Sequence, residues 1–348
     1  MNLGKVVLVG GTGMVGREIL EVMKKHDLKP SKLIITGLRT IGTNSITPYG
    51  ELPVVALDEN TLIDAQFVFF AAGASVSREL IPKLRGRDFR IIDLSSAFRY
   101  KTDVPLIIPS INGDAIGQAD LISCPNCTTS IALMALAPIH KNCGITRVNL
   151  VSYQAASGAG KDALDDLENQ IEAWSLNGFP IVDDCHTGNV PLPLAGNLIP
   201  RIDVLDPIWC GFTKEEMKTQ WESQKILFGL NNKEKVFVNS TCVRVPIRRC
   251  HSMVLTIELE HTSNSLEIEN ILNNAFGVTV IDDAQNWSLP IPLKMEGKEE
   301  IGVGRIRFSP DKNGKELILW ICGDQLLRGA ALTAVEIVEF ILDKKISY

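Results

Sequence analysis

The chain has 348 residues, of which 45% are hydrophobic and 22% charged, and its net charge is −6. A chain of this length can bury two sizeable cores, and its acidic balance, without a stripe of Lys and Arg, argues against nucleic-acid binding. Its longest apolar stretch, SIALMALAPI, is too short to cross a bilayer, and the N-terminal MNLGKVVLVGG lacks the features of a secretory signal. We therefore expect a cytoplasmic protein with no membrane partner.

The first part of the chain alternates strands and helices. It opens with KVVLVGGTGMVGREILEVMKK, which is a β-branched run, a glycine turn and an amphipathic helix with Val15, Ile19, Val22 and Met23 on one face. Further strands are predicted at KLIITG, AQFVFFAAG and RIIDLSS, with a short helix at SVSRELIPKLRG. This alternation up to about residue 130 predicts a Rossmann-type, doubly wound α/β sheet that is mostly parallel.

The pattern changes after CTTSIALMALAPIHKN. Strands are predicted at RVNLVSYQ, KVFVNSTCVRV, SMVLTIELE, GVGRIRF and LILWICG, and helices at KDALDDLENQIEAW, KEEMKTQWESQKIL and SLEIENILNNAF. This mixture predicts an α+β domain on a mixed or antiparallel sheet. The final QLLRGAALTAVEIVEFILDKK is a periodic helix that we expect to pack on the first domain. The predicted division is therefore 1–130 completed by 325–348, and 131–324.

Three glycines lie where the first strand meets the first helix. Gly10, Gly13 and Gly16 have the spacing G-x-x-G-x-x-G. This spacing gives a tight turn, a close backbone approach to a phosphate, and a helix N-terminus directed at its charge. An ordinary strand–helix turn is the alternative, but the strand before and the helix after favour a dinucleotide. The expected cofactor-binding residues here are Gly10, Thr12, Gly13, Met14, Val15 and Gly16.

The end of the second strand, IITGLRT, bears on which dinucleotide is bound. A site that prefers NAD usually has Asp or Glu there, to bind the ribose 2′-hydroxyl. Here no acidic residue follows, and the guanidinium of Arg39, with Thr40 beside it, suits a 2′-phosphate. A solvated surface arginine is the alternative. The sequence therefore predicts NADP.

The pair Cys124 and Cys127 in SCPNCTT admits several functions. Eight cysteines are too few for a disulfide scaffold in a chain of this size, so reduced thiols are expected. A structural zinc needs four ligands, but no second C-x-x-C occurs, and Cys185–His186 and Cys250–His251 are sequence neighbours with poor geometry for one metal. A thioredoxin-like dithiol is also disfavoured, because the nucleotide-binding fold already explains the strand–helix pattern around these cysteines. We therefore expect no metal site.

A nucleophile remains. Pro125 is not compatible with a helix interior, so a helix is expected to begin near Cys127, with Thr128 and Thr129 in its first turn. A thiol at a helix N-terminus lies near free N–H groups and the positive end of the dipole, which favour the thiolate. The alternative is a buried structural cysteine. The position favours Cys127 over Cys124 as the reactive thiol.

Several short segments occur in a specific order over nearly the whole chain: GGTGMVG, SSAFR, VPLIIPSIN, PNCTT, SYQAASGAGKDAL, EEMK, RVPIRRCHS and GRIR. Together they resemble the aspartate-semialdehyde dehydrogenase family. A sister family, which reduces N-acetyl-glutamyl phosphate, has the same architecture, but PNCTT and SYQAASGAG are more similar to the aspartate branch.

The resemblance implies a role for each of several residues. The catalytic group is Cys127 as nucleophile, Asn126 beside it, Gln154 to orient the acyl group and His251 as general acid/base. The substrate group is Arg244 for the carboxylate, Arg99 and Lys218 for phosphate, and Glu215 for the amino acid portion. Ser157, Gly158 and Gln325 would contact the nicotinamide half of the cofactor.

Other interpretations of these residues stay open. Glu215 and Lys218 are three apart on a helix that Thr213 and Glu216 can cap with a capping box, so a surface ion pair is the alternative. Without the resemblance, His186 is as good a candidate as His251. The chain also departs from the family pattern: Cys250 and Met253 flank His251, Leu94 precedes SSAFR, and Thr43 replaces a lysine after Arg39.

The resemblance implies reversible, NADP-dependent reductive dephosphorylation of L-aspartyl-4-phosphate to L-aspartate 4-semialdehyde through a Cys127 thioester. It further implies a homodimer formed by the second domain, and a place in lysine, threonine, methionine and diaminopimelate biosynthesis. The alternatives are an N-acetyl-gamma-glutamyl-phosphate reductase and a non-catalytic Rossmann binding module in which the cysteines are structural.

Overall fold

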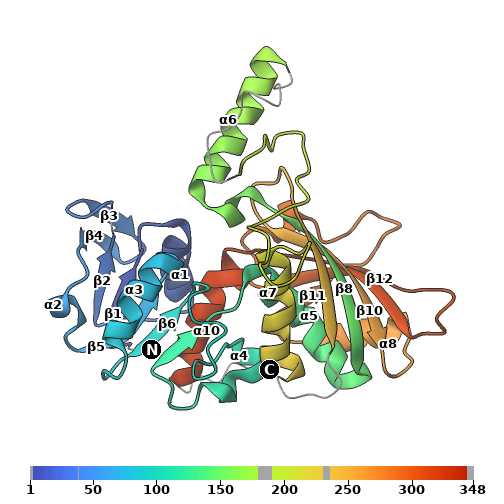
Figure 1. Ribbon diagram of the computed structural model, residues 1–348, viewed down its shortest axis with the longest axis horizontal. Helices are drawn as coiled ribbons and strands as arrows, with labels where there is room; N and C mark the ends of the chain where they lie inside the picture. Colours follow the sequence, from blue (N-terminus) through green and yellow to red (C-terminus); the bar gives the residue numbers. More distant parts are fainter. Residues whose placement is uncertain (1–2, 38, 179–189, 230–235, 343–348) are drawn as a thin grey trace. The chain divides into compact units, whose positions relative to one another are not determined.

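The computed structural model describes residues 3–37, 39–178, 190–229 and 236–342. The chain divides into two compact units, Met1–Ser130 with Leu326–Tyr348, and Ile131–Gln325 (Figure 1). The division falls inside the helix α5 (Cys127–Cys143) and again just after Gln325. Within the described residues, no helix is both long and apolar enough to span a membrane.

The first unit is built on a sheet with the strand order β3-β4-β2-β1-β5-β6-β7. Every described pair in it is parallel except β3 with β4. The strands are β1 (Lys5–Val9), β2 (Lys32–Thr36), β3 (Asn44–Thr47), β4 (Gly50–Val55), β5 (Ala65–Phe70), β6 (Arg90–Asp93) and β7 (Leu121–Ser123). The helices are α1 (Met14–Lys25), α2 (Glu59–Leu62), α3 (Ala74–Leu84), α4 (Pro109–Asn112), the 3₁₀ turn η1 (Gly113–Ile116), the π-turn η4 (Leu327–Ala331) and α10 (Leu332–Ile341).

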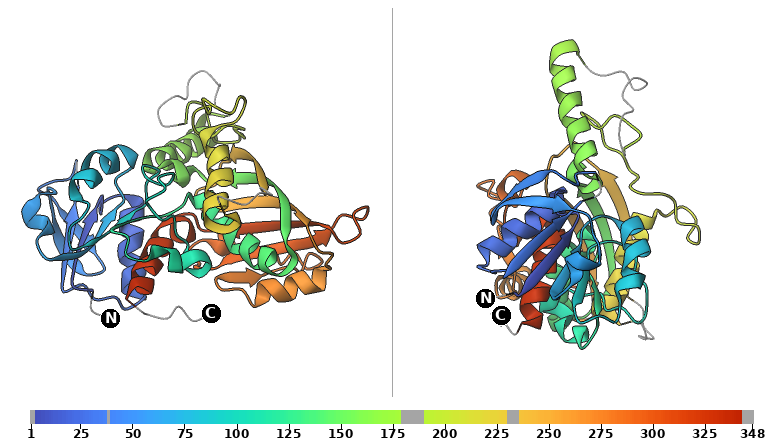
Figure 2. Two further views of the ribbon diagram at one scale, coloured as in Figure 1. Left: turned by 60° about the horizontal axis from the view of Figure 1, so that its bottom comes forward. Right: turned by 90° about the vertical axis from the view of Figure 1, so that its left-hand side faces the viewer.

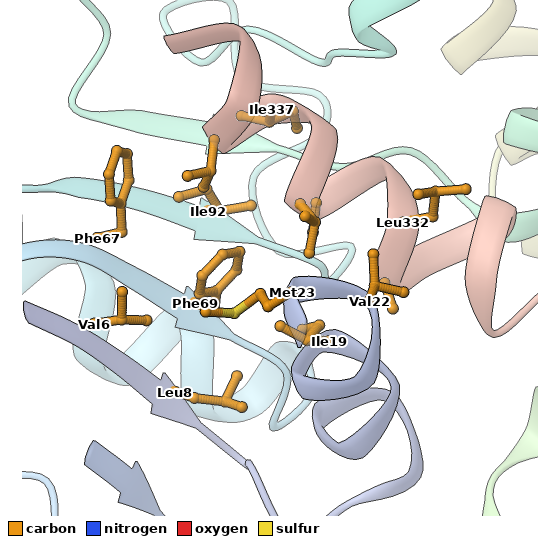
Figure 3. Packing of buried hydrophobic residues seen from close by; sticks show 14 of the residues in the cluster. Val6, Leu8, Ile19, Val22, Met23, Phe67, Phe69, Ile92, Leu332 and Ile337 are labelled. Carbon is orange, nitrogen blue, oxygen red and sulfur yellow. The ribbon is translucent and has the colours of Figure 1, made fainter. Parts of the chain in front are cut away.

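Both faces of this sheet are buried. On one face, Phe67 and Phe69 of β5 pack with Ile19 and Met23 of α1 and with the C-terminal helix α10 (Figure 3). On the other face, alternate strand residues pack with α3 in a second cluster. Parallel strands that are buried on both faces read as near-continuous apolar runs, as in KVVLV and AQFVFF. Buried residues of η4 and α10, among them Leu332 and Ile337, belong to the same core cluster.

The second unit is built on a mixed sheet with the order β11-β12-β13-β10-β8-β9. The pairs β8–β9 and β11–β12 are parallel and the others antiparallel. The strands are β8 (Ile145–Gln154), β9 (Phe237–Arg244), β10 (His251–Leu259), β11 (Val278–Val280), β12 (Ile301–Phe308) and β13 (Glu316–Gly323). The helical elements besides α5 are η2 (Ala156–Ala159), α6 (Lys161–Asn177), α7 (Lys214–Ser223), its π continuation η3 (Gln224–Phe228), α8 (Ser265–Asn273) and α9 (Pro292–Met295).

The register of the mixed sheet gathers polar residues at one edge. Gln154, the last residue of β8, pairs with Arg244, the last residue of β9. The first residue of β10 is His251, and Ser252 beside it pairs with Tyr153 of β8. Three strand ends therefore place Gln154, Arg244 and His251 at the same edge of the sheet.

The predicted fold class, a Rossmann-type first domain and a second α+β domain on a mixed sheet, is confirmed. The sequence analysis missed β3, β4, β7 and β11, which are short strands of three to six residues at or near sheet edges. Short strands of this kind bury too few side chains to leave a clear periodic pattern. The expected C-terminal helix runs as η4 and α10 to Ile341, and residues 343–348 lie outside the described part.

Candidate active site

The glycine turn between β1 and α1 is closely packed. Gly10 has a φ of +85°, and a Cβ there would lie 2.8 Å from the carbonyl carbon of Ala71. A Cβ at Gly16 would lie 2.4 Å from the carbonyl oxygen of Gly10. Gly13 is the N-cap of α1 and leaves the helix N-terminus without a side chain over it. The turn therefore needs glycine for its conformation and for contact of helix with strand, which are the requirements of a dinucleotide turn.

The segment after β2 lies against this turn. The hydroxyls of Thr12 and Thr40 are 3.1 Å apart and share a hydrogen bond. Arg39, next to Thr40, is exposed. Met14 and Val15, in the first turn of α1, are partly buried. The residues that were expected to bind the cofactor in the first unit thus border one turn, with an arginine next to it.

Cys127 is the first residue of α5, as the position of Pro125 predicted. The Oδ1 atom of Asn126 accepts hydrogen bonds from the backbone N–H groups of Thr128 and Thr129, at 2.9 and 3.3 Å. Asn126 therefore caps the helix, and it is buried. Cys127 is partly accessible and stands at the positive end of the helix dipole, where a thiolate is favoured.

The neighbouring thiol has the opposite environment. Cys124 is 1% exposed, and burial raises its pKa well above the ordinary value. Its carbonyl oxygen accepts a hydrogen bond of 2.8 Å from Nε of Arg99, and a second guanidinium nitrogen of Arg99 donates to the carbonyl of Leu94 at 3.0 Å. Arg99 is thereby held against the segment that leads to Cys127. Of the two thiols, Cys127 has the environment of a nucleophile.

The C-terminal segment of the first unit also contacts Cys127. A Cβ at Gly329, within the π-turn η4, would lie 2.6 Å from Cβ of Cys127. The next residue before it, Arg328, is 2% exposed and donates to both carboxylate oxygens of Glu336 at 2.8 and 2.7 Å. This buried ion pair holds η4 on α10. Gly329 is a residue that the sequence analysis missed.

In the second unit, His251 is fully buried. Its Nδ1 atom accepts a hydrogen bond of 3.1 Å from the N–H group of Ala155. Burial, and then the charge of Arg244, lower the pKa of His251 to about 3. The ring is therefore neutral at physiological pH, and because Nδ1 accepts, its proton lies on Nε2. His251 holds a proton that it can donate.

Arg244 and Gly158 complete the surroundings of this ring. Arg244 is 5% exposed, and its Nη1 donates to the carbonyl of Ala155 at 2.6 Å. A Cβ at Gly158 would lie 2.9 Å from Cε1 of His251 and 3.1 Å from Nη1 of Arg244. Only a glycine at this position leaves both side chains where they are.

A chain of hydrogen bonds connects the edge of the sheet to α7. The Nε2 atom of Gln154 donates to Glu215 Oε1 at 3.3 Å, and Lys218 Nζ donates to Glu215 Oε2 at 2.9 Å. The predicted capping box of Thr213 and Glu216 is present. Glu215 and Lys218 do form an ion pair, but because Glu215 is only 5% exposed, it is not a surface pair. Burial would lower the pKa of Lys218, but Glu215 and Asp203 outweigh it and raise that pKa.

The side chain of Gln325 forms hydrogen bonds with Cys250, which precedes His251, and with Ser157. Its Oε1 atom accepts from the N–H group of Cys250 at 2.7 Å, and its Nε2 atom donates to the hydroxyl of Ser157 at 2.6 Å. Cys250 has a φ of +74°, and its side chain packs with Cys322 and Met295. Gln325 therefore joins the segments that flank His251, a function that the sequence did not indicate.

Two family models match this chain: the semialdehyde dehydrogenase NAD binding domain over residues 5–119, and the semialdehyde dehydrogenase dimerisation domain over residues 136–328. The aspartate-semialdehyde dehydrogenase of Aquifex aeolicus is 37% identical over 347 residues, 97% of this chain and 98% of the relative. That of Bacillus subtilis is 35% identical over 341 residues, 96% of each chain. The chain belongs to the aspartate-semialdehyde dehydrogenase family. A crystal structure of aspartate semialdehyde dehydrogenase II from Vibrio cholerae, complexed with ASA, matches with a TM-score of 0.89 at 31% identity and covers 98% of this chain and 99% of that one.

Within this family member, the site residues separate by unit. In the first unit, Arg99 contacts the backbone of Cys124, three residues before Cys127, and Asn126 precedes Cys127 directly. Gln154, Glu215, Lys218, Arg244 and His251 form one cluster in the second, with Ser157, Gly158 and Gln325 around His251. His186, the other candidate, lies outside the described residues. Among the described residues, no group of three or more His, Cys, Asp or Glu side chains is arranged to hold a metal ion.

Proposed function

We propose that this chain is a phosphorylating aspartate-semialdehyde dehydrogenase that interconverts L-aspartyl-4-phosphate and L-aspartate 4-semialdehyde. The observation that carries the proposal is the contrast of the two thiols: Cys127 is at a capped helix N-terminus and partly accessible, whereas Cys124 is buried with a raised pKa. Family membership supplies the substrate. The enzyme would then serve lysine, threonine, methionine and diaminopimelate biosynthesis.

The chain's own residues can carry out the covalent steps. The Cys127 thiolate attacks the acyl phosphate carbon, phosphate leaves, and a thioester forms on the sulfur. Arg99 and Lys218 bind the phosphate, and Arg244 holds the substrate carboxylate by a two-pronged contact. His251 donates the proton on its Nε2 atom to the substrate oxygen when the tetrahedral hemithioacetal is reached, and recovers it when semialdehyde leaves.

NADP is the proposed cofactor, and the residues of the first unit fit it. The tight turn at Gly10 and Gly16 has no room for a Cβ, the N-terminus of α1 is open to a phosphate, and Arg39 is exposed next to this turn. Bound there, the dinucleotide supplies or accepts the hydride. Arg39 would bind the 2′-phosphate, and Gly158 with Ser157 would lie beside the nicotinamide.

The acidic side chain Glu215 favours the aspartate substrate over its nearest rival. A buried carboxylate is a partner for a free ammonium group, whereas the acetylated amine of N-acetyl-gamma-glutamyl phosphate is neutral and bulkier. The substrates of the two families therefore differ at the group that Glu215 would bind.

The test is NADPH formation by the purified protein with NADP, with and without phosphate, on L-aspartate 4-semialdehyde and on N-acetyl-glutamate semialdehyde. We expect phosphate-dependent signal with the first substrate only. Signal with the second substrate only would keep the Cys127 chemistry but overturn the substrate. No signal with either, from a folded protein that binds NADP, would favour a binding module.

We also infer that the protein is a homodimer formed by its second unit. The matched dimerisation model covers this unit, and α6 extends away from the mixed sheet (Figure 1, Figure 2). Apolar side chains are exposed on α6 and on the segment that follows it: Ile171, Trp174, Leu176, Leu198, Ile208 and Trp209. A second copy that covers them would bury this apolar area.

The dimer can be tested by replacing Leu176, which is 74% exposed, with Asp. Light scattering should then show a monomer in place of the dimer. A wild-type protein that is itself a monomer would contradict the inference.

A further inference from the structure

Lys218, the proposed phosphate ligand, lies between two carboxylates. Its Nζ atom is 2.8 Å from Oδ2 of Asp203 and 2.9 Å from Oε2 of Glu215. The Lys218 side chain is 17% exposed, and those of Asp203 and Glu215 are 32% and 7% exposed. Asp203 is part of this cluster although no sequence pattern indicated it.

The backbone holds Asp203 in place. Its φ is +70°, a conformation that Asp and Asn adopt more readily than most residues, and its Oδ1 accepts from the N–H group of Val204 at 2.8 Å. The carbonyl of Val204 accepts in turn from the N–H group of Lys214, the first residue of α7, at 2.9 Å. The loop is thereby tied to the helix one turn before Lys218, with Oδ2 directed at the ammonium group.

The two carboxylates that contact Lys218 do not favour an anion at its Nζ atom. Two carboxylates face one ammonium, so the three groups together are negative, and Lys218 donates to both. A phosphate that binds Lys218 must therefore compete with Asp203 and Glu215 for the hydrogen bonds that the ammonium group donates. Both carboxylates also repel the phosphate. The same negative charge attracts the substrate's ammonium group.

We propose that Asp203 is a specificity-determining residue that competes with phosphate for Lys218. By doing so it weakens phosphate binding, and its negative charge favours the ammonium group of the substrate. The proposal rests on the proposed function, because it takes Lys218 to be a phosphate ligand. It predicts that removing the charge of Asp203 strengthens phosphate binding. If Asp203 had only a structural function, its removal would weaken phosphate binding.

Asp203→Asn is the most suitable variant. Asn also tolerates the positive φ, and its side-chain oxygen can still accept from Val204, so the variant removes the charge and replaces Oδ2 by an amide that cannot accept from Lys218. We expect the KM for inorganic phosphate in semialdehyde oxidation to fall about fivefold, the order of one partly exposed ion pair. The KM for L-aspartate 4-semialdehyde should rise, because the cluster becomes less negative. If this variant does not fold, Asp203→Gly suits the same φ and carries the same expectation.

Three further variants identify the cause. Asp165→Asn removes the charge from another Lys–Asp pair in the same unit, that of Lys161 on the exposed face of α6, and should leave both KM values unchanged. In the background of Lys218→Met, the Asp203→Asn change should have no further effect on the KM for phosphate, because the effect acts through Lys218. An unchanged or raised KM for phosphate in Asp203→Asn, from a wild type whose activity needs phosphate, would overturn this proposal alone. A wild type without phosphate-dependent activity would overturn the proposed function and this proposal with it.

Discussion

The candidate site residues of the first unit and those of the second unit are positioned in different ways. Cys127 is positioned by neighbours in sequence: Asn126 caps the helix through Thr128 and Thr129. His251 is positioned by residues far along the chain, since its Nδ1 partner Ala155 is 96 residues away and the Cys250–Gln325 bond spans 75 residues. Local sequence therefore encodes the activation of the nucleophile, whereas the state of the proton donor depends on the tertiary fold.

The largest effect is expected at Cys127, which is positioned by its neighbours in sequence. Cys127→Ser replaces a thiolate by a hydroxyl that stays protonated, and we expect kcat to fall at least ~10³-fold. Circular dichroism and NADP binding should be retained. Cys124→Ala is the matched control, because its thiol is buried with a raised pKa, and it should keep kcat within a few-fold. A Cys127→Ser enzyme that retained more than a few per cent of activity would remove this residue from its proposed function.

The next effect concerns the close packing around His251. Gly158→Ala introduces a Cβ within 3.0 Å of its Nε2 atom, so the ring or Arg244 must move. A displacement of this size lowers rates up to ~100-fold, so we expect kcat/KM to fall roughly 30-fold. The fold should be retained in circular dichroism, because the atoms nearest the added Cβ are side-chain atoms of His251 and Arg244 and no backbone atom is among them. Full activity of this variant would show that the position of His251 is not critical.

A smaller effect is expected at Gln325, whose side chain connects Cys250, next to His251, with Ser157. Gln325→Leu removes the acceptor of the Cys250 N–H group and the donor to Ser157, so we expect kcat to fall about tenfold. Gln325→Glu keeps an acceptor for the Cys250 N–H group and should retain most of the activity. If both variants instead raised the KM for NADP with unchanged kcat, direct contact with nicotinamide would be the function of this residue.

The smallest effect is on stability. The pKa of His251 is about 3 when folded, against about 6.5 for an unfolded histidine. Above pH 6.5 both states are neutral, and below it the unfolded chain binds a proton that the folded protein does not, so stability falls as the pH decreases toward 3. Between pH 7 and 5.5, wild type should lose ~1 kcal/mol that His251→Asn does not lose. Urea unfolding at the two pH values measures this, and equal losses would contradict the buried, neutral ring.

The same contrast explains what could be predicted from the sequence. The turn at Gly10, the helix that begins at Cys127 and the capping box at Thr213 all depend on residues a few positions apart, and each was predicted. The resemblance to the family supplied His251, Arg244 and Glu215. Their surroundings depend on strand register and loop contacts, such as that of Asp203 with Lys218 or Gly158 with His251, which no local pattern encodes.

The central claim is that Cys127 forms a thioester that phosphate releases. The most direct measurement is rapid mixing of the enzyme with NADP and L-aspartate 4-semialdehyde, with NADPH followed by absorbance and the quenched protein by mass spectrometry. Without phosphate, we predict a burst of about one NADPH per subunit and an aspartyl adduct on the peptide that contains Cys127. With phosphate, turnover should continue and the adduct should disappear. Steady turnover without phosphate, or an adduct on a different residue, would contradict this account.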